Sequence, residues 1–111
     1  MKDILVIGGG GFVGSAIVKG LINKDVIVTV AGRSHYPHIE KLGVTCFKGD
    51  IADPTFVDTI CRNVDTVFHV AAKAGIWGSW SEYEAANVTG TKNVVQACLK
   101  HKVERLVYTS T

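Results

Sequence analysis

Two hydrophobic patterns alternate along this chain. Short apolar runs at residues 3–7, 26–30, 44–48, 65–70 and 104–109 predict β-strands, while spaced apolar positions at 12–23, 37–42, 53–62 and 81–101 predict amphipathic helices. Asp53 is expected to cap the third helix, with Pro54 in its first turn. The apolar stripe of the first helix is expected to comprise Phe12, Val13, Ala16, Ile17, Gly20 and Leu21. In the last helix, Val88, Thr91, Val94, Val95, Cys98 and Leu99 are expected to face the sheet.

The alternation of strand and helix predicts one α/β domain over residues 1–111. Strands joined by helical crossovers must run parallel, and right-handed crossovers give the strand order 3-2-1-4-5 with helices on both faces. The sequence stops after the fifth strand, whose outer edge then lacks a neighbouring strand, so we expect self-association or poor solubility. The long connection at residues 71–80 contains Trp77 and Trp80. These side chains either form one wall of an apolar cleft or anchor the connection to the last helix.

Glycines cluster between the first strand and the first helix. Two spacings fit, Gly8-x-x-Gly11-x-x-Gly14 and Gly9-x-Gly11-x-x-Gly14, and the second is the general dinucleotide fingerprint. Glycine lets the backbone approach a ligand closely, and the free N–H groups at a helix N-terminus attract a diphosphate. No Gly-Lys-Ser/Thr follows, which argues against a P-loop; a glycine-rich hairpin in another fold is the remaining alternative. The flanking strand and helix favour a dinucleotide site in a doubly wound, Rossmann-type sheet.

The end of the second strand and the residues that follow it, residues 28–34, indicate which dinucleotide is bound. NAD sites carry an acid there for the ribose 2′-hydroxyl, but no acid occurs between Val26 and Ile39. A carboxylate would repel a 2′-phosphate, whereas Arg33 can form paired charge-assisted bonds to it and Ser34 adds a hydroxyl. We therefore favour NADP(H), with NAD possible, over the alternative that Arg33 is a solvated loop residue. The missing acid also counts against a SAM-dependent methyltransferase.

Composition argues against several other classes. A formal net charge of +2, without a basic cluster, gives no footprint for nucleic acid. No apolar run approaches the roughly 18 residues that span a membrane. A strand begins at once after the N-terminus, which leaves no room for a signal peptide, so we expect a cytoplasmic protein. The three cysteines are expected to be small buried residues, and neither they nor the four histidines have the spacing of metal ligands.

Several short motifs coincide with the glycines. They are Gly49-Asp50-Ile51, His69-Val70-Ala71-Ala72, Asn87-Val88-x-Gly90-Thr91 and Val107-Tyr108-Thr109-Ser110-Thr111. Together they resemble the N-terminal half of an extended short-chain dehydrogenase/reductase, also called the NAD-dependent epimerase/dehydratase family. Residues 71–78 resemble the branch that holds 3-beta-hydroxysteroid or sterol dehydrogenases and 2-alkyl-3-oxoalkanoate reductases.

The resemblance implies roles for residues near the adenosine and the pyrophosphate. The backbone amides of Phe12 and Val13 would lie against the pyrophosphate. Asp50 would accept a hydrogen bond from the adenine amino group, and Ile51 would pack on the adenine ring. The alternative for Asp50 is that it caps a turn.

The resemblance also implies roles beyond the fourth strand. The small side chains of Ala71 and Ala72 would let the adenosine ribose and the nicotinamide approach, with Lys73 near the phosphates. Asn87 would lie beneath the cofactor and hold the strand-end loops or a ribose, or it would be purely structural.

Members of this family transfer hydride between nicotinamide and a carbonyl or alcohol carbon. A Tyr acts as general acid/base, a Lys four residues later lowers its pKa, and a Ser or Thr bonds the reacting oxygen. The resemblance places that hydroxyl at Thr111, but Tyr-x-x-x-Lys does not occur in the 111 residues. This favours a truncated part of a longer reductase, and we expect the chain alone to be inactive.

Three functions are compatible with the sequence. The first is the NADP(H)-binding part of an oxidoreductase for a bulky apolar substrate, sterol-like or long-chain. The second is a non-catalytic dinucleotide-binding module that acts as a sensor or interaction protein. The third is a fragment of an NAD-dependent nucleotide-sugar epimerase or dehydratase.

Overall fold

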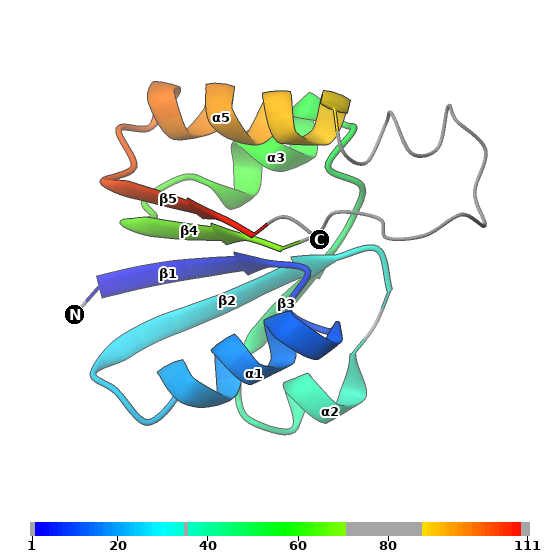
Figure 1. Ribbon diagram of the computed structural model, residues 1–111, viewed down its shortest axis with the longest axis vertical. Coiled ribbons are helices and arrows are strands. Elements are labelled where there is room, and N and C mark those ends of the chain that lie inside the picture. The colour runs from blue at the N-terminus through cyan, green and yellow to red at the C-terminus, as the bar shows by residue number, and fades with distance from the viewer. Residues whose placement is uncertain (1, 35, 71–87, 110–111) are drawn as a thin grey trace.

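The computed structural model describes residues 2–34, 36–70 and 88–109. Within these ranges five strands alternate with helices (Figure 1). The strands are β1 (Lys2–Ile7), β2 (Val26–Gly32), β3 (Thr45–Lys48), β4 (Thr66–His69) and β5 (Arg105–Tyr108). The helices are α1 (Phe12–Leu21), α2 (Pro37–Glu40), α3 (Pro54–Ile60) and α5 (Gly90–Lys100). Each strand closely matches the range that the hydrophobic pattern predicts.

The five strands form one parallel sheet with the order β3-β2-β1-β4-β5, which confirms the predicted topology. In this register Ile7 at the end of β1 lies beside Ala31 of β2 and His69 of β4. His69 in turn lies beside Tyr108 at the end of β5. The carboxyl ends of the strands therefore meet along one edge of the sheet, which is where ligands bind in open α/β folds.

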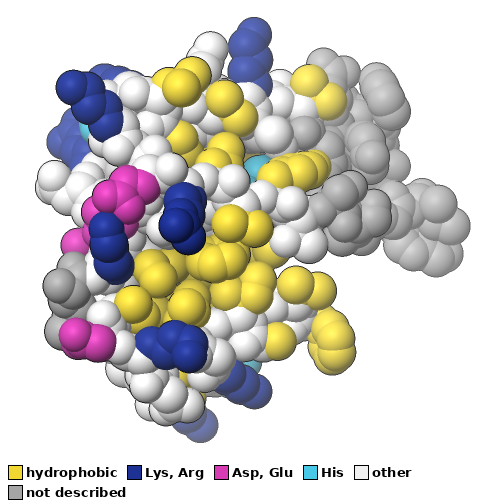
Figure 2. Space-filling view, turned by 60° about the vertical axis from the view of Figure 1, so that its left-hand side comes forward, with side chains coloured by type: hydrophobic (Ala, Val, Ile, Leu, Met, Phe, Trp, Pro, Cys, Tyr) yellow, Lys and Arg dark blue, Asp and Glu magenta, His cyan; other side chains and the backbone are white. Residues whose placement is uncertain are grey.

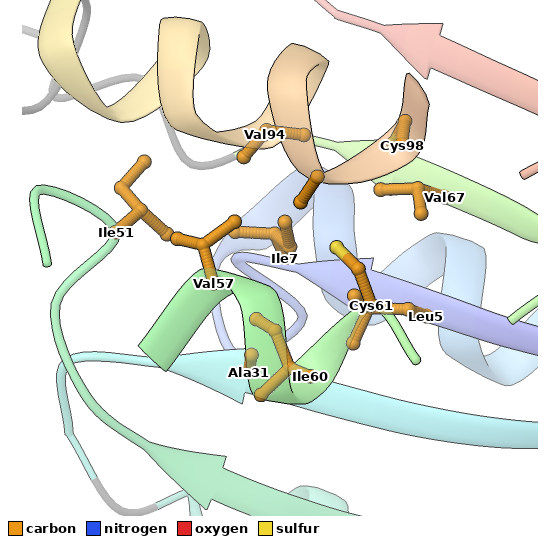
Figure 3. Packing of buried hydrophobic residues seen from close by; sticks show 11 residues of the cluster. Leu5, Ile7, Ala31, Ile51, Val57, Ile60, Cys61, Val67, Val94 and Cys98 are labelled. Carbon is orange, nitrogen blue, oxygen red and sulfur yellow. The ribbon is translucent and has the colours of Figure 1, made fainter. Parts of the chain in front are cut away.

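Helices cover both faces of the sheet (Figure 1), and a separate hydrophobic cluster fills each layer. Between the sheet and α3 and α5, Val57 and Cys61 approach Val94 and Cys98 over Leu5 of β1 (Figure 3). Between the sheet and α1 and α2, the cluster comprises Ile4, Val6, Val18, Val28, Val30, Ile39 and Val44. The prediction of buried cysteines is confirmed for Cys61 and Cys98, while Cys46 is half-buried.

The expected apolar faces of α1 and α5 need correction. In α5 the buried residues are Gly90, Val94, Ala97 and Cys98, whereas Val88, Val95 and Leu99 are exposed. In α1 Gly14 and Val18 are buried, and Ile17 and Leu21 of the expected stripe are half-buried and pack against the cluster on this face. Phe12 is 95% exposed and Val13 44%, so these two do not belong to the packed side. Apolar residues occur on two sides of each helix, so composition alone does not select the side that packs. In α1 the sheet-facing side repeats at three- and four-residue spacing through Gly14, Ile17, Val18 and Leu21.

Helix α3 is fixed at both ends by polar contacts. At its start the Asp53 carboxylate accepts a hydrogen bond from the Thr55 N–H at 3.0 Å, which confirms the predicted cap. Near its end the Asp58 carboxylate lies 2.8 Å from the Lys100 ammonium and 3.0 Å from His101 Nε2, both near the end of α5. Hydrogen bonds from Lys100 and then from His101 lower the pKa of Asp58 to about 2. These contacts join α3 to α5 at the surface, outside the hydrophobic cluster.

Candidate functional site: the carboxyl edge of the sheet

The glycine-rich turn between β1 and α1 lies at the centre of the carboxyl edge. The Gly8 N–H continues the ladder by donating to the Ala31 carbonyl at 2.8 Å, and the Gly11 N–H then donates to the Gly8 carbonyl at 3.1 Å. Gly8 has a φ of 87°, a conformation that favours glycine. The turn thus carries the chain from the central strand directly into α1.

Gly14 lets α1 approach this turn closely. A Cβ atom placed on Gly14 would overlap the carbonyl group of Gly8 and the Cα of Gly9. In dinucleotide fingerprints the third glycine allows the same close packing of helix against strand. Both candidate spacings end at Gly14. Gly8-x-x-Gly11-x-x-Gly14 begins at the glycine with the positive φ, and a Cβ atom on Gly9, which begins the other spacing, would overlap the Val30 side chain.

The N-terminus of α1 has the features of an anion site. Gly11 occupies the N-cap position and offers no side chain to the first N–H groups, and the first turn contains no acidic residue. The first intrahelical bond comes from the Ser15 N–H to the Gly11 carbonyl at 2.8 Å, so the amides of Phe12 and Val13 precede it. These donors, together with the positive end of the helix dipole, fit a pyrophosphate group.

Arg33 and Ser34 lie immediately after β2, beside the glycine turn in the sheet order. Both residues are exposed. Gly32, the last residue of β2, is buried and leads directly into them. The structure therefore brings the cationic and hydroxyl side chains to the same edge as Gly8 and the start of α1.

Asp50 and Ile51 follow β3 at this edge but face different surroundings. The exposed Asp50 carboxylate accepts a hydrogen bond from the Ala52 N–H at 2.9 Å, and its carbonyl accepts one from the Asp53 N–H at 3.0 Å. The Asp50 carboxylate thus stabilises a turn, while its predicted hydrogen bond from the adenine amino group stays a prediction. Ile51 is 6% exposed and belongs to the cluster under α3 and α5, so its proposed packing on an adenine ring stays a prediction.

The end of β4 carries a buried histidine that the sequence indicated only as part of the motif His69-Val70-Ala71-Ala72. His69 is 1% exposed, and its Nε2 lies 2.9 Å from the Thr91 hydroxyl in the first turn of α5. Its Nδ1 is buried without a hydrogen-bond partner among the described residues. Burial lowers the pKa of His69. The sequence could have predicted this burial, because His69 follows Val67 by two residues in the strand and therefore lies on the same buried face.

Some predicted site residues lie outside the described ranges. They are Ala71, Ala72, Lys73, Asn87 and Thr111. Trp77 and Trp80 of the long connection also lie outside these ranges. Their roles stay predictions. In the part of the chain that is described, no three His, Cys, Asp or Glu side chains group in a way that would hold a metal ion. No described helix is long and apolar enough to cross a membrane.

Sequence comparison extends these observations. Residues 5–111 match the model of the "3-beta hydroxysteroid dehydrogenase/isomerase family". The chain is 52% identical over 108 residues to a 2-alkyl-3-oxoalkanoate reductase of Stenotrophomonas maltophilia, covering 97% of this chain and 33% of that protein. It is 46% identical over 111 residues to a 2-alkyl-3-oxoalkanoate reductase of Shewanella oneidensis, covering all of this chain and 29% of that protein. The chain thus spans about a third of the length of these relatives.

Comparison of structures gives the same fold. The UDP-glucose 4-epimerase of Thermus thermophilus, solved as a complex with NAD, superposes with a TM-score of 0.86 and 32% sequence identity. The match covers 98% of this chain and 37% of the epimerase. The predicted doubly wound architecture and the resemblance to the epimerase/dehydratase family are therefore confirmed.

Proposed function

Because the chain belongs to the 3-beta hydroxysteroid dehydrogenase/isomerase family of extended short-chain dehydrogenases/reductases, we propose that it is the NADP(H)-binding part of an oxidoreductase. The observation that carries the proposal is the turn from Gly8 to Gly14. It places uncapped amides of α1 at the carboxyl edge of the sheet, between β2 and β4. The nicotinamide, when bound, donates or accepts a hydride. The described residues bind and orient the rest of the dinucleotide.

The pyrophosphate would lie against the amides of Phe12 and Val13. An uncapped helix start without acidic residues favours two negative charges there, and Gly14 leaves no side chain between helix and turn. This part of the proposal holds for NAD and NADP(H) alike, since both carry the same pyrophosphate.

Preference for NADP(H) rests on the end of β2. Gly32 has no side chain to bind a ribose 2′-hydroxyl, and the exposed Arg33 and Ser34 follow it directly. A guanidinium suits a phosphate because it offers several donors in one plane. Bonds of this charged kind are worth about 1.5–3 kcal/mol each, enough to set the preference between the two cofactors.

Isothermal titration of NADPH and NADH into the 111-residue chain tests this proposal. We expect tighter binding of NADPH, and we expect Arg33→Asp to remove the preference while NADH binding persists. Arg105→Asp makes the same charge change on the exposed start of β5, at the opposite edge of the sheet, and should leave the preference intact. Equal binding of both cofactors by the unaltered chain would refute the NADP(H) assignment, and tighter binding of NADH would favour NAD.

We further propose that the parent activity reduces a keto group or oxidises a hydroxyl on a bulky apolar molecule. Support comes from the family match and from the two relatives named as 2-alkyl-3-oxoalkanoate reductases. The role of Thr111 in bonding the reacting oxygen is part of this proposal.

Self-association through β5 is a related proposal. All four residues of β5 are exposed, among them Leu106, Val107 and Tyr108. Hydrophobic side chains also gather across the middle of the face seen in Figure 2, with Lys and Arg side chains around them. An exposed apolar edge strand favours pairing with a second copy. Sedimentation should therefore give a mass that rises with concentration, and a constant monomer mass would refute it.

A further inference from the structure

The aromatic ring of Tyr36 lies across the glycine-rich turn. A Cβ atom placed on Gly10 would overlap ring carbons of Tyr36, so the ring rests directly against the backbone of the turn. Tyr36 itself lies between β2 and α2, where its carbonyl accepts hydrogen bonds from the Ile39 and Glu40 N–H groups at 2.9 and 3.0 Å. The start of α2 therefore fixes the backbone from which the ring projects.

The Tyr36 hydroxyl occupies the space that a side chain at position 32 would fill. A Cβ atom placed on Gly32 would overlap the phenolic oxygen. Gly32 ends β2, at the position from which NAD sites project an acid towards the adenosine ribose. In this chain a neutral hydroxyl, supplied by Tyr36, stands where the carboxylate would be.

Neighbouring side chains hold the ring in this position. The imidazole of His38 lies edge-on to the Tyr36 ring, with centroids 6.4 Å apart and planes at 78°. His38 Nε2 is 3.5 Å from the Ser15 hydroxyl, which donates to the Gly9 carbonyl at 3.1 Å. The ring is thus braced against α1 and the turn. The Tyr36 hydroxyl makes no hydrogen bond to any of the described residues, so its donor is available to a ligand.

We infer that Tyr36 is a specificity-determining residue of the dinucleotide site, whose hydroxyl donates a hydrogen bond to the 2′-phosphate of the adenosine ribose. The inference deepens the proposed function and rests on it. Arg33 and Ser34 lie in the same segment and supply charge and a second hydroxyl. A phenol hydroxyl suits this place because it donates to a phosphate oxygen without the repulsion that a carboxylate brings.

Calorimetric titration with two fragments tests the inference without any catalytic readout. The fragments are ADP-ribose and 2′-phospho-ADP-ribose, which differ only in the 2′-phosphate. Tyr36→Phe keeps the ring on the glycines and removes only the hydroxyl, so the fold should persist, as circular dichroism can verify. We expect about tenfold weaker binding of 2′-phospho-ADP-ribose and a change of less than about twofold for ADP-ribose.

Tyr108→Phe provides a matched control, because it removes a phenol hydroxyl from the end of β5, which lies on the other side of β1 from β2. It should leave both affinities unchanged. If Tyr36→Phe binds each of the two fragments as tightly as the unaltered chain does, the inference is overturned while the proposed function stands. If the unaltered chain binds neither fragment, the proposed function fails and the inference fails with it. Tighter binding of both fragments to Tyr36→Ala, with no change in their ratio, would show that the ring only blocks the site and would also overturn the inference.

Discussion

The first and last strand–helix–strand units of this protein share a topology but differ in what they expose. In β1–α1–β2, both strands run through the interior of the sheet, and residues 4–7 and 30–32 at their carboxyl ends are buried. In β4–α5–β5, the outer strand forms an edge, and each of its residues is exposed. The same parallel crossover therefore serves as the core of the fold in one place and as a surface in the other.

The two units also present different chemistry at the carboxyl edge. The first unit turns through glycines and offers backbone N–H groups, with α1 packed so closely that position 14 has no room for a side chain. The second joins its strand to its helix through side chains, since His69 contacts Thr91. We conclude that the first unit is sensitive to added atoms, while the second depends on which side chains are present and in which protonation state.

Truncating one leucine in each unit should give the largest difference. Leu5 of β1 has no exposed surface, whereas Leu106 of β5 is 36% exposed. Leu5→Ala should lower the free energy of unfolding by about 2–5 kcal/mol, because it leaves a cavity under α3 and α5. Leu106→Ala should cost less than about 1 kcal/mol, because water already reaches the site. Urea unfolding monitored by circular dichroism measures both, and similar losses would contradict the distinction between central and edge strands.

Adding one methyl group to α1 should have different effects at Gly14, which packs against the glycine turn, and at Gly20, where an added Cβ atom would have no neighbour within 4 Å. Gly14→Ala should destabilise the protein by about 1–3 kcal/mol, because the new Cβ overlaps the Gly8 carbonyl and pushes α1 away from the turn. It should also abolish binding of ADP-ribose, since the donors of Phe12 and Val13 move with the helix.

Gly20 provides the matched control. A Cβ atom there would meet nothing within 4 Å, so Gly20→Ala should stabilise the helix by up to about 1 kcal/mol and leave binding unchanged. Thermal unfolding and calorimetric titration of both variants give the comparison. Retained binding in Gly14→Ala would show that the close approach of α1 is not required for the site.

The hydrophobic pattern predicted the sheet well because each strand reports its own burial. Alternating or continuous apolar runs mark strands locally, and parallel crossovers restrict their order to few arrangements. The glycine turn could also be predicted from the sequence. Gly8 adopts a positive φ that favours glycine, and position 14 has no room for the Cβ atom of any other residue. Each of these requirements concerns a few neighbouring residues, so a short segment of sequence is enough to predict it.

The features that sequence analysis missed depend on contacts between distant segments. The ring of Tyr36 lies against Gly10, which belongs to the turn between β1 and α1. The Thr91 hydroxyl contacts His69, which is 22 residues earlier in the sequence. Likewise, the packed sides of α1 and α5 could not be chosen from composition, since Leu99 is as apolar as Val94 yet 75% exposed. Only the sheet decides which side of a helix is covered.

Protonation of His69 should produce the smallest of these effects and the one most specific to the last unit. His69 is the one buried polar or charged residue among those described, and burial lowers its pKa below the ordinary value of 6.5. The unfolded chain therefore binds this proton more readily than the folded protein does. Its contribution to stability is complete above pH 6.5 and falls as the pH drops below 6.5. One proton limits the change in the free energy of unfolding to about 1.4 kcal/mol per pH unit.

Unfolding in urea at about pH 7.5 and at about pH 5.5, on either side of that ordinary value, measures this effect. The free energy of unfolding should fall more for the unaltered protein than for His69→Gln, which cannot take up the proton. The same loss in both proteins would mean that water or a nearby acceptor already solvates the imidazolium, and that the last unit is no more sensitive to protonation than the first.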